Sequence, residues 1–98
     1  MTEITADTFK AQVHDTFPTI EWQDVQTWTM GTNPPSFRID SKDNIFSVIY
    51  NAFPMTWEVS CSHLGFSGEF DFLHQAKEDL SNRINLYIQH FDTLLSYL

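Results

Sequence analysis

Few residues of this chain have the types and spacing that chemistry requires. Cys61 and His63 lie two residues apart at the end of a predicted strand, so their side chains would point to the same side if the extended conformation continues, and His74 follows. These three could offer thiolate and imidazole ligands, but a structural zinc needs four, and no CxxC or HxxxH pair accompanies them. We therefore expect no metal, no cofactor and a buried free cysteine.

Catalysis by a nucleophile or by paired carboxylates is also poorly supported. Cys61 lies in a segment, 43–76, without any Lys or Arg, so nothing there would favour a thiolate. Glu69 with Asp71, and Glu78 with Asp79, lack the glycine and the further oxygen ligands of a calcium loop. With only three glycines, the chain has no phosphate-binding loop. We expect no catalytic residue and no enzyme activity.

The longest predicted element is an amphipathic helix over 71–98. It contains no Gly or Pro, and at about 1.5 Å per residue it would extend for roughly 40 Å. After Leu73, its apolar residues recur at alternating steps of three and four positions from Leu80 onward, which predicts one continuous apolar face: Leu73, Leu80, Ile84, Tyr87, Phe91, Leu94 and Leu98.

Two interpretations of this apolar face stay open. A heptad with Lys77, Ile84, Phe91 and Leu98 at one core position and Leu73, Leu80, Tyr87 and Leu94 at the other could form a dimer seam. Ala76, Ile88 and Leu95 widen the face, however, which favours packing on a sheet. We expect sheet packing, with apolar surface left at one end of the helix where a homodimer could form.

The remaining elements are predicted to supply that sheet. Thr5 is a suitable N-cap for a short helix ending at Phe17. Strands are predicted over 20–30, 36–40, 45–53 and 55–61, followed by a loop over 62–69. The sequence thus predicts one α+β domain spanning residues 1–98: an antiparallel meander of three to four strands with a short N-terminal helix and a long C-terminal helix packed on it.

The chain is strongly acidic. Five Lys and Arg against thirteen Asp and Glu give a net charge of −8, which disfavours nucleic acid and anionic membranes and favours basic partners. Without a basic, apolar leader or a membrane-spanning stretch, we expect a cytoplasmic protein. Nine carboxylates are the candidate partner-binding residues, expected to form one negative stripe if the fold brings them together: Glu3, Asp7, Asp15, Glu21, Asp24, Glu58, Glu69, Asp71 and Glu78.

In length, acidity and lack of catalytic motifs, the chain resembles the small acidic anti-CRISPR proteins of phages that mimic DNA. That resemblance implies a non-enzymatic inhibitor, acting in the bacterial host cytosol, that binds the positively charged nucleic-acid-binding surface of a CRISPR effector complex and blocks target DNA. The element order is also similar to that of bacterial secretion chaperones. This second resemblance implies a small acidic adaptor that binds a partner protein as a dimer.

Overall fold

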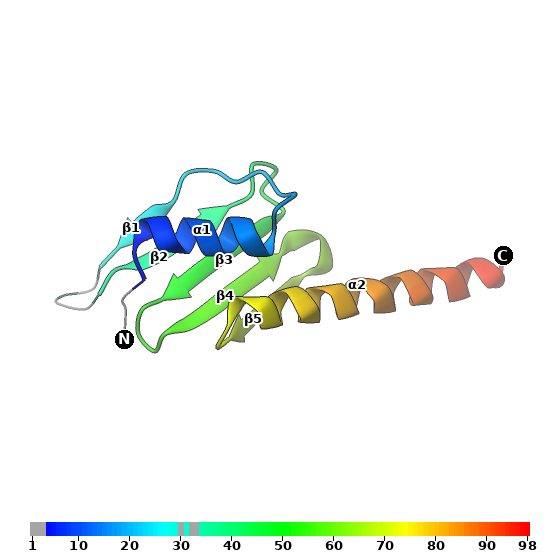
Figure 1. Ribbon diagram of the computed structural model, residues 1–98. Helices are drawn as coiled ribbons and strands as arrows, with labels where there is room; N and C mark the ends of the chain where they lie inside the picture. The colour runs from blue at the N-terminus through cyan, green and yellow to red at the C-terminus, as the bar shows by residue number, and fades with distance from the viewer. Residues whose placement is uncertain (1–3, 30, 32–33) are drawn as a thin grey trace.

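The structure, a computed structural model, describes residues 4–29, 31 and 34–98. Two helices flank a run of strands and one short 3-10 helix (Figure 1). In chain order the elements are α1 (Ala6–Thr16), β1 (Gln26–Trp28), β2 (Ser36–Asp40), β3 (Phe46–Asn51), β4 (Thr56–Cys61), η1 (Ser62–Leu64), β5 (Phe66–Phe70) and α2 (Leu73–Ser96). The predicted α+β class is confirmed, with five strands instead of three to four.

The five strands form an antiparallel meander in the order β1-β2-β3-β4-β5. Because side chains alternate along each strand, one face of the sheet gathers the buried apolar residues. Along the register this inner face carries Phe37, Ile39, Val48, Tyr50, Trp57, Val59, Cys61 and Phe66. The opposite face is largely polar, with Ser47, Glu58 and Ser60 among its side chains.

The fifth strand was not predicted, because its sequence has the glycines of a loop. Gly65 adopts the left-handed conformation after η1, and the chain then pairs with β4 from Phe66 to Phe70. A Cβ built on Gly68 would lie 2.8 Å from the Phe66 ring and 3.0 Å from the Phe70 ring. Gly68 therefore leaves room for two aromatic rings on the inner face, and it does not mark a turn.

The predicted strand over 20–30 is mostly wrong. Among its described residues, 20–29, β1 is the one strand, and Trp22 forms an isolated β-bridge to Ser41. The Trp22 side chain is nevertheless buried. This residue, although of a type that favours strands, contributes a packed ring here and does not extend the hydrogen bonding of a strand pair. Met55, the first residue of the predicted strand over 55–61, instead lies in the turn before β4 and is 47% exposed. Met30 lies outside the described residues.

Helix α1 closes the core over the inner face. Thr5 caps it, since its hydroxyl accepts a hydrogen bond from the Thr8 amide at 3.2 Å, as predicted. Phe9 and Val13 are completely buried, and the Phe9 ring stacks on Phe37 and on Trp57. These contacts fix α1 across β2 and β4.

A buried hydroxyl organises the turn between β2 and β3. The Ser41 Oγ accepts hydrogen bonds from the Phe46 amide at 2.9 Å and from the Ile45 amide at 3.1 Å. It donates to the Asp43 carboxylate at 2.6 Å. The Ser41 hydroxyl and then the Ile45 amide lower the pKa of Asp43 below its ordinary value, because both stabilise the carboxylate form.

Helix α2 is confirmed, but the predicted packing of its apolar face on the sheet holds for only part of its length. Leu73, Ala76 and Leu80 are buried against the sheet and α1, whereas every residue from Ser81 onward is exposed. Figure 1 shows the second half of α2 projecting away from the sheet. The molecule is consequently elongated, measuring 58 × 24 × 21 Å. The rest of the domain, without this projecting half, is called the body below.

Candidate functional site

The most prominent surface of the molecule is apolar and lies on the projecting half of α2. Seven side chains form it, and together they are called the distal stripe: Ile84, Tyr87, Ile88, Phe91, Leu94, Leu95 and Leu98. Their exposed fractions start at 41% for Ile84, are 57% for Phe91 and 67% for Leu95, and reach full exposure at Leu98. Their spacing places them on the same side of the helix as the buried Leu73 and Leu80, so the distal stripe continues the core-facing side.

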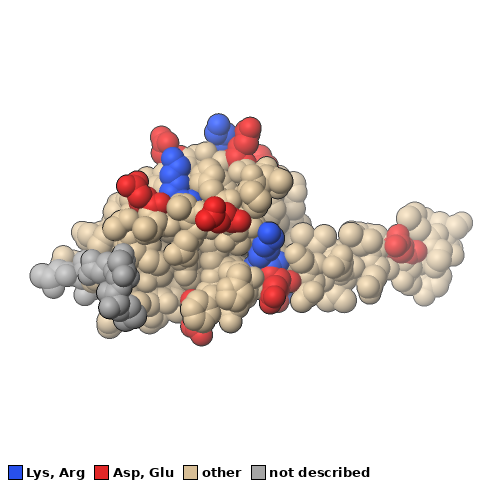
Figure 2. Space-filling model, viewed as in Figure 1, with Lys and Arg blue, Asp and Glu red and all other residues tan. Residues whose placement is uncertain are grey.

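The distal stripe is nearly free of charge. Asp92 is the one Asp, Glu, Lys or Arg between positions 84 and 98. Figure 2 shows the projecting helix almost entirely without charged side chains, whereas acidic and basic groups are mixed over the body. Large exposed apolar patches on soluble proteins usually mark interaction sites. The distal stripe is therefore the first candidate binding surface.

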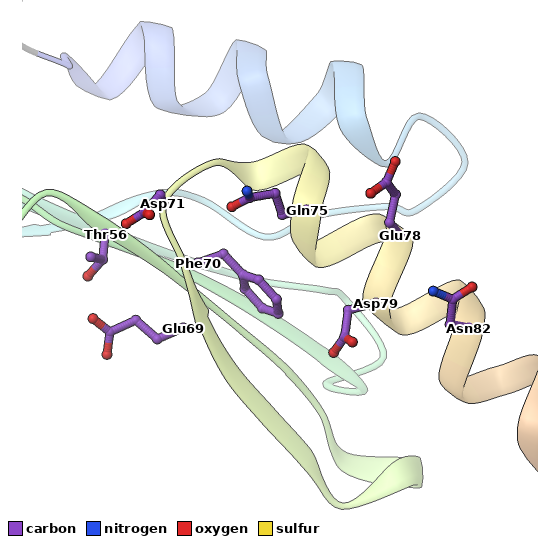
Figure 3. Close-up of a pocket in the computed structure, with 8 residues that line it drawn as sticks. All are labelled: Thr56, Glu69, Phe70, Asp71, Gln75, Glu78, Asp79 and Asn82. Carbon is purple, nitrogen blue, oxygen red and sulfur yellow. The ribbon is translucent and has the colours of Figure 1, made fainter.

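The second candidate is a groove of about 530 Å³ at the root of α2, called the acidic groove below (Figure 3). The start of β4, the end of β5 and the first turns of α2 form its wall: Thr56, Glu69, Phe70, Asp71, Gln75, Glu78, Asp79 and Asn82. The structure thus brings together three of the nine predicted binding residues, Glu69, Asp71 and Glu78. The Gln75 side chain accepts a hydrogen bond from the Phe72 amide at 3.1 Å and so holds the start of the helix at this wall.

Carboxylates in and beside the acidic groove differ in how they are held. Asp79 forms an ion pair with Arg83 at 2.9 Å, so its charge is locally compensated. Glu69 lies directly opposite Glu58 in the register of β4 and β5, and like charges at such a pair are unfavourable. Asn51 donates a hydrogen bond to the Glu58 carboxylate at 3.1 Å, and this bond holds the Glu58 side chain in place beside the groove.

The other predicted acidic residues do not line the groove. Asp7 and Asp15 lie in the first and last turns of α1, and Glu21 and Asp24 lie between α1 and β1. Asp15 instead lines a smaller pocket together with His74. Glu3 lies outside the described residues. The acidic groove is therefore a smaller cluster than the single negative stripe that the sequence suggested.

The cysteine and histidines are separated by burial. Cys61 is 4% exposed on the inner face of the sheet, whereas His63 and His74 are exposed. Among residues 4–29, 31 and 34–98, no group of three or more His, Cys, Asp or Glu side chains is placed to hold a metal ion.

The sequence favours the acidic residues as the partner-binding surface, whereas in the structure the distal stripe is the more prominent candidate. The periodicity of apolar residues predicts the apolar face of the helix, but it does not predict the position at which packing against the sheet and α1 stops. One signal was available: the near absence of charge after Arg83, which differs from the charged 77–83 stretch before it.

Fold and surfaces together define a small α+β protein with a protruding, uncovered amphipathic helix. The chain matches no protein-family model, and the searches of curated proteins and of solved structures gave no match either. Within the described part of the chain, no helix combines the length and apolarity needed to cross a membrane.

Proposed function

We propose that this chain is a non-enzymatic adaptor that binds protein through the distal half of α2. The observation that carries the proposal is the distal stripe, in which seven large apolar side chains continue the core-facing side of the helix and are each at least 41% exposed. A helix presenting residues at i, i+3, i+4 and i+7 is a common protein-recognition element. This class is the one implied by the resemblance to secretion chaperones.

A pair of charge-matched substitutions tests this proposal. Phe91→Glu places a carboxylate in the middle of the distal stripe, and Gln89→Glu places the same charge on the polar side of the same helix. In pull-downs with tagged full-length protein, we expect Phe91→Glu to abolish association with any copurifying protein, including untagged copies of the chain. Gln89→Glu should retain it. Equal association by both variants, with unchanged helical circular dichroism, would contradict the proposal.

A second candidate function rests on the acidic groove. Glu69, Asp71 and Glu78 are among the residues that line the groove. Glu58 and Glu69 face each other across β4 and β5, and stability alone does not favour two like charges at such a pair. A basic surface of a nucleic-acid-binding protein would relieve that repulsion. On this basis we propose, as the second candidate function, a DNA-mimicking inhibitor of a CRISPR effector complex, which is the function that the anti-CRISPR resemblance implies.

Salt and charge reversal separate this second candidate from the adaptor. We expect an inhibitor to lose affinity for a purified effector complex steeply as salt rises, because the contacts would be between opposite charges. Glu69→Lys should weaken binding by roughly tenfold or more, whereas Asp92→Lys, far along the helix, should change it little. Salt-independent binding, or equal effects of the two reversals, would exclude the acidic groove as the contact surface.

A further inference from the structure

We infer that the distal stripe is covered by a second copy of the same chain, with the two α2 helices antiparallel and a two-fold axis passing beside Phe91. This inference deepens the proposed adaptor function and rests on it. It names the occupant of the surface and the orientation of that occupant.

The spacing of the distal stripe is symmetric about Phe91. Ile88 and Leu94 lie three residues before and after it, Tyr87 and Leu95 four, and Ile84 and Leu98 seven. In an antiparallel pair centred on Phe91, each apolar side chain therefore meets an apolar side chain of the other copy. A two-fold interface requires such self-complementarity, because the same patch serves both chains. Binding to an unrelated partner would not require the apolar spacing to be symmetric about Phe91.

The position of the body selects the antiparallel orientation. Leu73, Ala76 and Leu80 contact the body on the same side of α2 that carries the distal stripe. Two parallel helices joined at their stripes would direct both bodies into the same space. In the antiparallel pair, each body lies beyond the C-terminal end of the other helix. The body end beside that tip includes Phe66, over which Arg83 is stacked at 4.4 Å.

The exposed area is sufficient for a stable dimer. Seven large side chains, each exposing about half of a surface of roughly 200 Å², offer on the order of 700 Å² per chain. Specific protein interfaces bury roughly 600–1,000 Å² on each partner, so the distal stripe alone offers an area toward the lower end of that range. The near absence of charge along 84–98 also limits repulsion between two chains that each carry −8.

Helix stability gives an independent reason for a cover. The projecting segment is about 15 residues long, a length at which isolated helices are marginal in water. Most helical stability in proteins comes from packing of the amphipathic face. Among the residues that the structure describes, none packs over the projecting half of α2 in this way, and an antiparallel second copy supplies that packing along the whole stripe.

Light scattering on the full chain is the first test. We expect a mass of twice 11.4 kDa, retained or strengthened in high salt because apolar contacts dominate and repulsion between the acidic bodies is screened. Phe91→Glu should raise the dimer dissociation constant by roughly 30-fold or more, since each substitution occurs twice beside the two-fold axis. Gln89→Glu should leave the mass unchanged.

Disulfide trapping tests the orientation. In a Cys61→Ala background, Phe91→Cys should cross-link to itself, and a mixture of Ile84→Cys with Leu98→Cys should cross-link between the two variants. Ile84→Cys alone should not, because the two copies of position 84 would lie roughly 21 Å apart along the helices. Efficient self-linking by Ile84→Cys would show a parallel pair and overturn the inferred orientation.

A monomeric wild-type chain would overturn the inference altogether. The proposed function would then survive only if capture of a different protein still depended on Phe91 and not on Gln89. If neither the mass nor any capture responded to Phe91→Glu, both the inference and the proposed function would be excluded.

Discussion

Phe9→Ala is expected to remove about 3–5 kcal/mol from the free energy of unfolding. Phe9 has no exposed surface, and its ring centre lies 5.5 Å from that of Phe37 and 5.6 Å from that of Trp57. The substitution loses the transfer free energy of the ring and leaves a cavity between α1 and the sheet. Domains of this size are stable by only about 5–15 kcal/mol, so much of the margin would be lost.

Chemical denaturation monitored by tryptophan fluorescence and circular dichroism measures this effect. Phe53→Ala is the matched control, because the same atoms are removed from a side chain that is 82% exposed. We expect the control to change the free energy of unfolding by about 0.5 kcal/mol or less. Similar losses for the two variants would show that α1 is not packed on the sheet as described.

Ser41→Ala is expected to cost about 1–3 kcal/mol, although it removes a single oxygen atom. The Ser41 Oγ accepts from the Phe46 and Ile45 amides and is completely buried. The Asp43 carboxylate also accepts from the Ile45 amide at 3.1 Å, so that group keeps a partner. The Phe46 amide would lose its acceptor beside a buried site, which is the main source of the cost.

Ser67→Ala is the control for this second substitution. Ser67 is exposed on β5, so removing its hydroxyl, which water can solvate, leaves no buried polar group without a partner. In equilibrium denaturation, the free energies of unfolding of the Ser41→Ala and Ser67→Ala variants should differ by more than about 1 kcal/mol. If Ser41→Ala were as stable as the wild type, the hydroxyl network of the β2–β3 turn would not be a determinant of the fold.

The helices were predictable because their signals are local. Thr5 caps α1, and the three- and four-residue spacing of α2 needs no knowledge of its neighbours. The β5 strand was missed because Gly65 and Gly68 signal a loop, whereas Gly68 in fact accommodates two rings. These rings belong to Phe66 and Phe70, two residues before and after Gly68 on the same strand, so the alternation of apolar positions was a local strand signal that the glycines outweighed.

The candidate surfaces were predictable only in part. Sequence position placed Glu69, Asp71 and Glu78 near the start of the long helix, and the structure places them on one groove. The acidic residues of α1 do not join that groove, since strand order, and not charge, decides which segments become neighbours. Likewise, periodicity is the same for a covered and an uncovered apolar face, so the point after Leu80 where cover ends required the structure.

Amide hydrogen exchange over residues 84–98 of the full-length chain, measured across a range of protein concentrations, tests most directly whether the projecting helix is a binding surface. If a second copy covers the distal stripe, protection of these amides should rise with protein concentration, while protection within the sheet stays constant. Phe91→Glu should abolish that rise. Protection of 84–98 that is independent of concentration and unaffected by Phe91→Glu would contradict the account.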